Sequence, residues 1–305
     1  MTSPFGPLVI IANPRAGQGK VERHLPEIER SLTDAGLAYR IVRTTHPGHA
    51  TEAARQALEM GDRYLVAAGG DGTVNEVLNG MLDDGAAAND AVLGIVAAGS
   101  GCDLIKSLGV PGDAVRASQH LLTDAVRHID VGKVAFTDGG HEVTRYFANI
   151  AEAGLGAAVV ARTTKLPRSL GAAKYFCGFW LTLPAFHPAV VKLDTDDSSF
   201  EWRAHNVVVA NCQYYGGGMH ISPKSQPDDG MLDVLAMVGP KTDAFTMLPK
   251  IYKGTHLPHR DIAEARARTV RIDANPPLLI EADGEMLGTT PATFAVVPNA
   301  IRVKV

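Results

Sequence analysis

Residues 66–80, VAAGGDGTVNEVLNG, combine the end of an apolar run, a glycine turn and the start of a helical pattern. The apolar residues 64–68 predict a strand in a sheet that is covered on both faces. Gly69, Gly70 and Gly72 carry no Cβ atom, so a ligand can approach the backbone of this turn closely. A strand, a glycine turn and a helix in this order are typical of a phosphate-binding site.

The residues after the turn support this interpretation. We expect Thr73 to be the N-cap of the helix and Glu76 to complete a capping box. The helix would then direct its first N–H groups at an anion. Asp71 places a carboxylate beside that anion, which is expected where a divalent cation lies between them. A tight turn that binds no ligand is the alternative for residues 69–72, and the Thr-x-Asn-Glu sequence that follows favours a nucleotide.

Short apolar strands alternate with helical patterns through the first 130 residues. This alternation predicts βαβ units and a parallel sheet. We therefore expect residues 1–130 to form a doubly wound α/β domain that binds a nucleotide. The predicted strands are residues 8–12, 39–42, 64–68 and 91–97, and predicted helices include residues 50–60 and 114–122.

The pattern changes after residue 130, where clusters of Gly, Pro, Asn and Asp separate strand-like segments. We expect residues 131–289 to form a β-rich, antiparallel β-sandwich domain. Residues 293–297 and 300–305 are predicted to be a closing pair of strands. The other predicted strands are residues 145–150, 202–211, 231–238, 269–273 and 278–282.

Two segments interrupt the β-rich part. Residues 153–193 contain no Asp or Glu but combine basic residues with aromatic ones such as Phe179 and Trp180. This composition suits an anionic membrane surface and an apolar substrate, or a buried helix whose lysines extend to solvent. Residues 242–252 predict an amphipathic helix that packs on the sheet.

Composition excludes several classes of protein. The net charge of −4 over 305 residues argues against a general nucleic-acid-binding protein. Three cysteines without a C-x-x-C pair argue against a disulfide framework or a zinc site and favour a reducing cytoplasm. Pro184 and Pro188 break the longest apolar region, residues 175–191, so we expect no transmembrane segment. Any contact with a membrane would therefore be peripheral.

The sequence GGDGTVNEV at residues 69–77 resembles the nucleotide loop of the diacylglycerol kinase catalytic family, which includes sphingosine and ceramide kinases. NAD kinases share only the GGDG core. The segment from Asn13 to Gly17 is similar to the N-P-x-x-G segment of the family, and Thr44 matches a threonine of its next loop. The resemblance implies that ATP contacts Asn13, Pro14, Gly17, Thr44, Gly69, Gly70, Asp71, Gly72, Thr73, Asn75, Glu76, Gly99, Ser100 and Asp103.

The loop after the fourth strand departs from the family pattern Pro-x-Gly-Thr-x-Asn-Asp. It keeps Gly99 and Asp103 but has Ala97, Ser100 and Cys102 in place of Pro, Thr and Asn. Loss of the Asn amide removes two donors and one acceptor from this part of the pocket. Cys102 lies just ahead of a helix, which would lower the pKa of its thiol, or it serves only in packing.

Residues 222–233 form a polar loop that ends with three carboxylates in six residues. This density of oxygen ligands suits a hard cation, and an acidic turn is the alternative. The resemblance assigns a magnesium site to this Asp-Gly-x-Leu sequence. Asp229 would supply its carboxylate, and Gln226 and Met231 their backbone carbonyls.

Asp283 and Gly284 are expected to form a hairpin turn between two strands. Glu285 follows them and resembles the glutamate of the family's D-G-E segment, which is assigned as the base that deprotonates the acceptor hydroxyl. A carboxylate suits that role if its surroundings raise its pKa. Asp71 is the alternative base, and otherwise acts on the metal and the phosphate.

The resemblance covers nearly the whole chain, because its motifs occur in the family's order. It implies a lipid kinase that uses ATP and Mg²⁺ to phosphorylate diacylglycerol or a related lipid. It also implies that residues from about 290 to 305 return to the first domain. We expect a cytoplasmic protein, peripheral to the inner face of the membrane, and a homodimer is compatible with the sequence. The alternatives are an NAD kinase-like phosphotransferase and a non-catalytic lipid-binding member of the fold.

Overall fold

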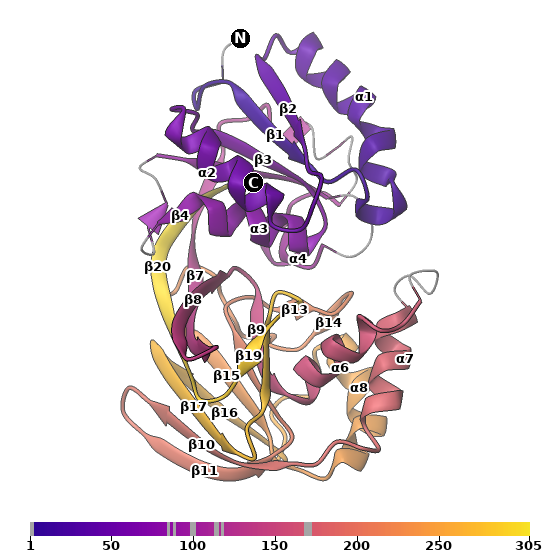
Figure 1. The fold of residues 1–305 in the computed structure, drawn as a ribbon, viewed down its shortest axis with the longest axis vertical. Coiled ribbons are helices and arrows are strands. Elements are labelled where there is room, and N and C mark those ends of the chain that lie inside the picture. Colours follow the sequence, from indigo (N-terminus) through magenta and orange to yellow (C-terminus); the bar gives the residue numbers. More distant parts are fainter. Residues whose placement is uncertain are drawn as a thin grey trace. The chain divides into compact units, whose positions relative to one another are not determined.

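The structure is a computed structural model that describes residues 3–83, 86–87, 90–97, 102–112, 116, 119–167 and 173–305. The chain forms two compact units (Figure 1). The first contains Met1–Val131 and Val297–Val305, and the second contains Gly132–Val296. Among the described residues, no helix is both long enough and apolar enough to cross a bilayer.

The first unit alternates strands and helices. Two of its strands belong to it only in part, because β7 (Val126–Asp138) leaves it and β20 (Ala292–Lys304) enters it. Its other elements are β1 (Leu8–Ala12), η1 (Ala16–Gln18), α1 (Lys20–Asp34), β2 (Tyr39–Arg43), α2 (His49–Glu59), β3 (Tyr64–Gly69), α3 (Asp71–Met81), β4 (Leu82–Asp83), β5 (Ala86–Ala87), β6 (Val92–Ala97) and α4 (Leu104–Leu108).

The main sheet of this unit has the order β2-β1-β3-β6-β20, and every one of these pairs is parallel. The order runs in one direction from β1 to β2 and in the other from β1 to β3. This reversal defines a doubly wound sheet and confirms the predicted class of the first domain. Residues 114, 115, 117 and 118 of the predicted helix over residues 114–122 lie outside the described residues.

Alternate residues of the buried strands serve opposite faces of the sheet. On one face, Ile10 and Val66 pack against Val21, Leu25 and other buried residues of α1. Helices α2 and α3 contact strands β1 and β3 and each other. Since both faces are covered, the strands are apolar throughout, as the sequence indicated.

The second unit consists mainly of strands. Its elements, besides its parts of β7 and β20, are β8 (His141–Phe147), β9 (Ile150–Gly154), α6 (Leu155–Thr163), α7 (Ala173–Thr182), β10 (Ala189–Thr195), β11 (Ser199–Ala204), β12 (Asn206–Ala210), β13 (Tyr214–Tyr215), β14 (Met219–His220), β15 (Leu232–Met237), η3 (Lys241–Asp243), α8 (Ala244–Lys253), β16 (Ile262–Ala267), β17 (Thr269–Asn275), β18 (Leu279–Ala282) and β19 (Glu285–Thr289).

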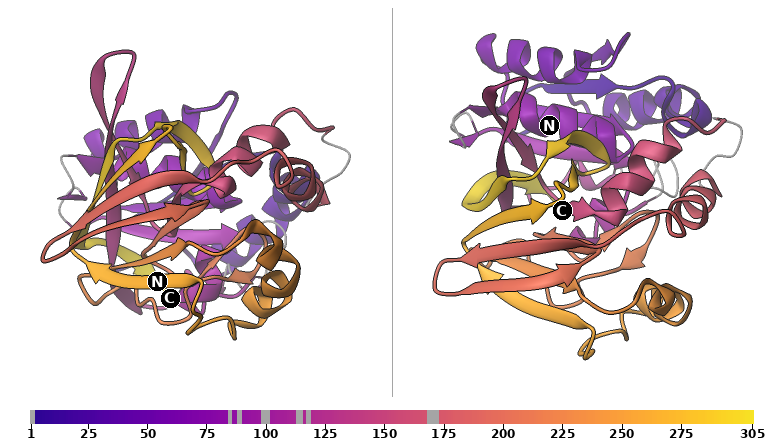
Figure 2. Two further views of the ribbon diagram at one scale, coloured as in Figure 1. Left: turned by 90° about the horizontal axis from the view of Figure 1, so that it is seen from below. Right: turned by 60° about the horizontal axis from the view of Figure 1, so that its bottom comes forward.

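Two sheets enclose the core of this unit (Figure 2). One has the order β11-β10-β17-β20, with β7 and β8 beside β20, and the other has the order β16-β15-β12-β9-β18-β19. Val191 and Phe294 from the first sheet share a core with Val207 and Ile280 from the second. The predicted antiparallel sandwich is therefore confirmed. Helix α8 packs on the second sheet through Met247 and Ile251, as expected for the segment 242–252.

Two strand predictions were wrong. The expected strand 202–211 is divided at His205, because β11 pairs with β10 whereas β12 pairs with β9 and β15 of the other sheet. The expected pair 293–297 and 300–305 is the single strand β20. Asn299 bends this strand at a φ of 50°, and its N–H donates to Oδ1 of buried Asp130. The chain therefore continues past Asn299 to pair with β6 and does not reverse.

Gly80 tests how closely α2 and α3 pack. A Cβ atom at Gly80 would lie 2.4 Å from the backbone oxygen of Thr51 and 2.7 Å from Cβ of Ala54. We expect Gly80→Ala to lower the free energy of unfolding by about 2 kcal/mol, despite its better helix propensity. Gly72 of the same helix has no atom within 4 Å of such a Cβ. Denaturant unfolding should show Gly72→Ala to be neutral or stabilising, and equal stability of the two variants would contradict the close contact.

Candidate functional site

The parallel pairing of β1, β2, β3 and β6 brings their carboxyl ends to one edge of the sheet. Ala12 pairs with both Arg43 and Ala68, and Gly69 pairs with Ala97. The loops that follow these four strands therefore begin at the same edge. Ligands of doubly wound sheets bind at this edge, where the strand order reverses. Here the reversal lies between the loops after β1 and β3.

The glycines of the loop after β3 have different roles. A Cβ atom at Gly69 would lie 2.3 Å from Oγ1 of Thr73, so Gly69 lets the first turn of α3 pack on the strand. At Gly70 and Gly72, by contrast, no described atom lies within 4 Å of a Cβ position. Packing within the protein therefore does not require glycine there. Open space above backbone amides fits a phosphate group.

Helix α3 begins three residues earlier than the capping prediction implies. Gly70 is its N-cap, and no side chain caps it, so Thr73 is not the N-cap. Oγ1 of Thr73 instead accepts a hydrogen bond from Nδ2 of Asn13 at 3.3 Å. The capping-box role of Glu76 was also wrong, because its Oε2 accepts from the N–H of Ala50 at 3.0 Å. A helix start without a protein cap is suited to bind an anion.

Asp71 and Asp103 are brought together although they are 32 residues apart. Oδ1 of Asp71 accepts a hydrogen bond from the N–H of Asp103 at 2.9 Å. Asp103 is buried and forms an ion pair with Nζ of Lys106 at 2.7 Å. Asp71, beside the open glycines at the end of the sheet, offers a carboxylate that Mg²⁺ can use together with phosphate oxygens, whereas Lys106 already neutralises Asp103.

Cys102 is buried next to these carboxylates. Its burial and the charge of Asp71 raise the pKa of the thiol well above its usual value. The alternative prediction of a lowered pKa for the Cys102 thiol is therefore wrong, and the thiol serves in packing.

The other predicted nucleotide contacts lie in the loops after β1 and β2 and within α3. Asn13 accepts from the N–H of Arg15 through Oδ1, Thr44 donates its N–H to the carbonyl of Ala12, and Asn75 is buried. Gly17 has a φ of 58°, which a residue with a side chain adopts only with strain. Pro14 lies in the same loop as Gly17. Gly99 and Ser100 lie outside the described residues.

The D-G-E segment lies in the second unit. Ala282 pairs with Glu285 across a two-residue turn, and Asp283 and Gly284 have φ values of 48° and 86°. Two positive φ values are those of a type I′ hairpin turn, so the predicted hairpin is confirmed. Glu285 is the first residue of β19 and is exposed.

The carboxylate of Asp283 does more than shape the turn, which the sequence pattern did not reveal. Its two oxygens accept hydrogen bonds from the N–H groups of Ala148, Asn149 and Ile150 at 2.9, 3.1 and 3.0 Å. Its own N–H donates to the carbonyl of Ile150. Charge-assisted hydrogen bonds of this kind are stronger than neutral ones. They attach the turn that carries Glu285 to the segment between β8 and β9.

A second feature that the sequence did not reveal is a buried pair of carboxyl groups beside this turn. Glu152 of β9 and Glu281 of β18 are cross-strand partners, 1% and 2% exposed. Burial raises the pKa of Glu152 to about 7, although hydrogen bonds from Tyr215 and Asn206 oppose the shift. Burial and the charge of Glu152 raise the pKa of Glu281 well above its usual value. The sequence does not reveal that these two glutamates form a buried pair, because they are 129 positions apart along the chain.

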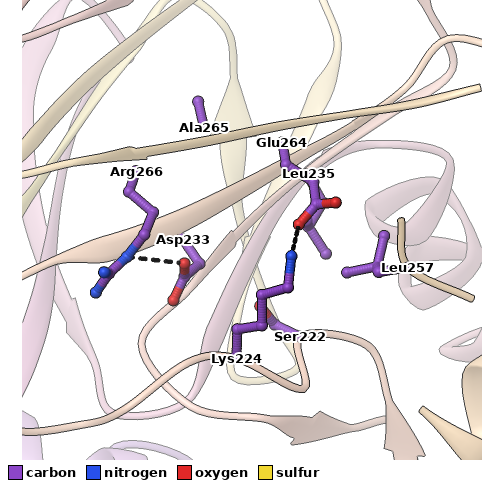
Figure 3. A pocket seen from close by; sticks show the side chains of 8 residues that line it. All are labelled: Ser222, Lys224, Asp233, Leu235, Leu257, Glu264, Ala265 and Arg266. Atoms are coloured by element: carbon purple, nitrogen blue, oxygen red, sulfur yellow. Dashed lines mark hydrogen bonds and ion pairs between the residues drawn. The ribbon is translucent and has the colours of Figure 1, made fainter. Parts of the chain in front are cut away.

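In the Asp-Gly-x-Leu loop, the carboxylate of Asp229 is already paired with a positively charged side chain of the protein, Arg266 of β16. Asp229 accepts from Nη2 of Arg266 through Oδ2, at 2.5 Å, and from the N–H of Met231 through Oδ1. Arg266 also pairs with Asp233 beside a cavity of about 240 Å³ (Figure 3). A metal ion held by Asp229 and the carbonyls of Gln226 and Met231 would compete with the guanidinium group for Asp229. This side chain therefore fits a magnesium site less well than Asp71 does.

Comparison with known proteins identifies the family. Residues 7–134 match the diacylglycerol kinase catalytic domain, and residues 149–305 match the YegS C-terminal NAD kinase beta sandwich-like domain. The glycine loop with Asp71 and Asp103 lies in the first match, and the D-G-E turn lies in the second. The chain belongs to the diacylglycerol kinase catalytic family and contains the catalytic domain of a kinase.

The similarity extends over whole relatives. The chain is 29% identical over 299 residues to a diacylglycerol kinase of Bacillus subtilis, covering 96% of this chain and 94% of the relative. It is 26% identical over 304 residues to one of Mycobacterium tuberculosis, covering 98% and 95%. A crystal structure of a diacylglycerol kinase from Bacillus anthracis shares the fold, with a TM-score of 0.74, 24% identity and coverage of 98% and 96%. Yeast NADH kinase is similar in fold at a TM-score of 0.50, 12% identity and coverage of 97% and 82%.

The raised pKa of Glu152 predicts a pH-dependent stability. Between about pH 4.5 and about pH 7 the folded state keeps a proton that the unfolded state loses. The free energy of unfolding should therefore fall as pH rises through this window, by about 3 kcal/mol for a shift of this size. In Glu152→Gln the contribution of Glu152 to this fall in the free energy of unfolding is absent. Denaturant unfolding of both proteins across the window measures the difference, and equal slopes would contradict the assignment.

Proposed function

We propose that this protein is an ATP- and Mg²⁺-dependent lipid kinase that phosphorylates a hydroxyl group of diacylglycerol or a related lipid. The observation that carries the proposal is the start of α3, which no side chain caps and where the space above Gly70 and Gly72 is open. This helix start lies at the sheet edge where the strand order reverses. The bacterial relatives named diacylglycerol kinase, which match over nearly the full chain, support a lipid as the acceptor.

The residues of the chain would divide the work. The backbone amides of the glycine loop and the start of α3 would bind the phosphates. Asp71 would hold Mg²⁺, which when bound neutralises phosphate charge during transfer. Glu285 would accept the proton of the lipid hydroxyl, with Asp71 as the alternative base.

Glu285→Gln tests this assignment. Without a base the hydroxyl is a weaker nucleophile, so we expect kcat to fall by about 100-fold or more while the KM for ATP stays unchanged. The measurement is formation of lipid phosphate from Mg-ATP and a total lipid extract, detected by mass spectrometry. Glu201→Gln, an exposed residue of β11, should retain full activity.

The outcomes of this assay separate the alternatives. Full activity of Glu285→Gln would remove Glu285 as the base and leave Asp71. If the parent phosphorylates NAD and no lipid, the protein is an NAD kinase-like phosphotransferase. If the parent consumes no ATP with either NAD or lipid as the acceptor, the protein is a non-catalytic lipid-binding member of the fold.

The exposed side chains of helices α7 and α8 favour a membrane lipid as the acceptor. Phe176 and Phe245 are 61% and 63% exposed, and Trp180 links them through ring centroid distances of 6.0 and 4.7 Å. Neither helix contains Asp or Glu, and Lys250 and Lys253 are exposed on α8. Exposed aromatic rings beside basic side chains fit an anionic bilayer surface. We therefore place the enzyme at the inner face of the cytoplasmic membrane.

Removing the two exposed phenylalanines tests this surface. We expect Phe176→Ser with Phe245→Ser to weaken binding to anionic phospholipid vesicles at least 10-fold, since each ring removes apolar area from water on binding. Vesicle co-sedimentation gives the measurement. Met60→Ser, which changes a 69% exposed side chain at the end of α2, is the matched control and should bind as the parent does. Equal binding of all three proteins would contradict a membrane role for this surface.

A further inference from the structure

Among the residues that the structure describes, none supplies a counter-charge to the buried pair Glu152 and Glu281. The two residues face each other across the antiparallel strands β9 and β18, so their side chains lie on the same face of the sheet. Among the described residues, no Lys or Arg forms an ion pair with either of them. Two adjacent carboxylates in such surroundings cannot both be ionised at modest cost. The pair therefore retains at least one proton near neutral pH.

The surroundings fix the positions of both carboxyl groups. Oε1 of Glu152 accepts from Nδ2 of Asn206 at 3.1 Å, and the hydroxyl of Tyr215 also bonds to Glu152. Gly156 allows this arrangement, because a Cβ there would lie 1.4 Å from Oε2 of Glu152. Among the described residues, Asn206 of β12, Tyr215 of β13 and Asp283 of the turn act on the pair, and Tyr252 of α8 acts on Tyr215.

Glu281 connects this pair to the D-G-E turn. Its Oε2 accepts a hydrogen bond from the N–H of Gly284 at 2.7 Å. Gly284 directly precedes Glu285, and its φ of 86° belongs to the turn geometry that sets the start of β19. A shift of the Glu281 carboxylate would therefore change the backbone from which Glu285 projects.

We propose that Glu152 and Glu281 act as a positioning pair for Glu285, with a proton retained by the pair keeping the Glu281 carboxyl group on the N–H of Gly284. This inference rests on the proposed function, in which Glu285 is the base. When the pair loses its last proton at alkaline pH, repulsion between the two carboxylates displaces Glu281 from Gly284. The turn then no longer holds Glu285 in place, and phosphoryl transfer slows.

The first test does not depend on activity. We would measure hydrogen exchange of the Gly284 amide by NMR in the parent protein, in Glu281→Gln and in Glu281→Leu. Gln keeps an acceptor oxygen, so protection should remain, whereas Leu removes it, and exchange should accelerate at least 10-fold. Equal protection in the parent and in Glu281→Leu would overturn the proposal.

The second test is the pH profile of lipid phosphorylation. We expect the parent to lose kcat at alkaline pH and Glu152→Gln to keep it, because one carboxylate alone meets no repulsion. Glu281→Leu should lower kcat at least 10-fold at every pH with the KM for ATP unchanged. Glu201→Gln, the exposed control residue of β11, should leave the profile unchanged.

The results separate the two proposals. Superimposable profiles of the parent and Glu152→Gln would overturn the positioning role while leaving the kinase intact. If the parent phosphorylates no lipid at any pH, the proposed function fails. The exchange of the Gly284 amide then still decides whether Glu281 holds the turn.

Discussion

The parallel pairing of β1 with β3 is the constraint on which the candidate nucleotide site depends. It places Asn13 and the glycine loop at one edge of the sheet, at the point where the strand order reverses. Gly69 then allows Thr73 to pack against the strand end, so that α3 starts at Asp71 with no side-chain cap. A helix start without a side-chain cap is suited to bind an anion.

At the D-G-E turn, backbone N–H groups also bind anions, but here the anions are carboxylates of the protein itself. There, three backbone N–H groups bind the carboxylate of Asp283, and a fourth binds Glu281. The protein supplies its own anions, and the result is a fixed turn. Both loops carry a residue for which we propose a role in phosphoryl transfer, Asp71 in one and Glu285 in the other. One loop is suited to bind a ligand, whereas the other is suited to hold a side chain in place.

Some of this organisation could be predicted because it is local. The strand at residues 8–12 is an uninterrupted apolar run, and the Asp283-Gly284 sequence specifies its own turn type. The predicted cap at Thr73 failed because Gly69 brings that side chain onto the strand, where it bonds to Asn13 instead. The break at His205 was missed because only the pairing of β11 and β12 with different sheets requires it.

The sequence by itself determined the doubly wound sheet, the antiparallel sandwich, the glycine loop and the order of the family's motifs, because each depends on residues that are close together along the chain. Only the tertiary structure decided that Asp71 meets Asp103, that Arg266 already neutralises Asp229, and that Glu152 lies against Glu281. Such contacts join segments that lie tens of residues apart or more. Strand register and burial set them, and the spacing of residues along the chain specifies neither.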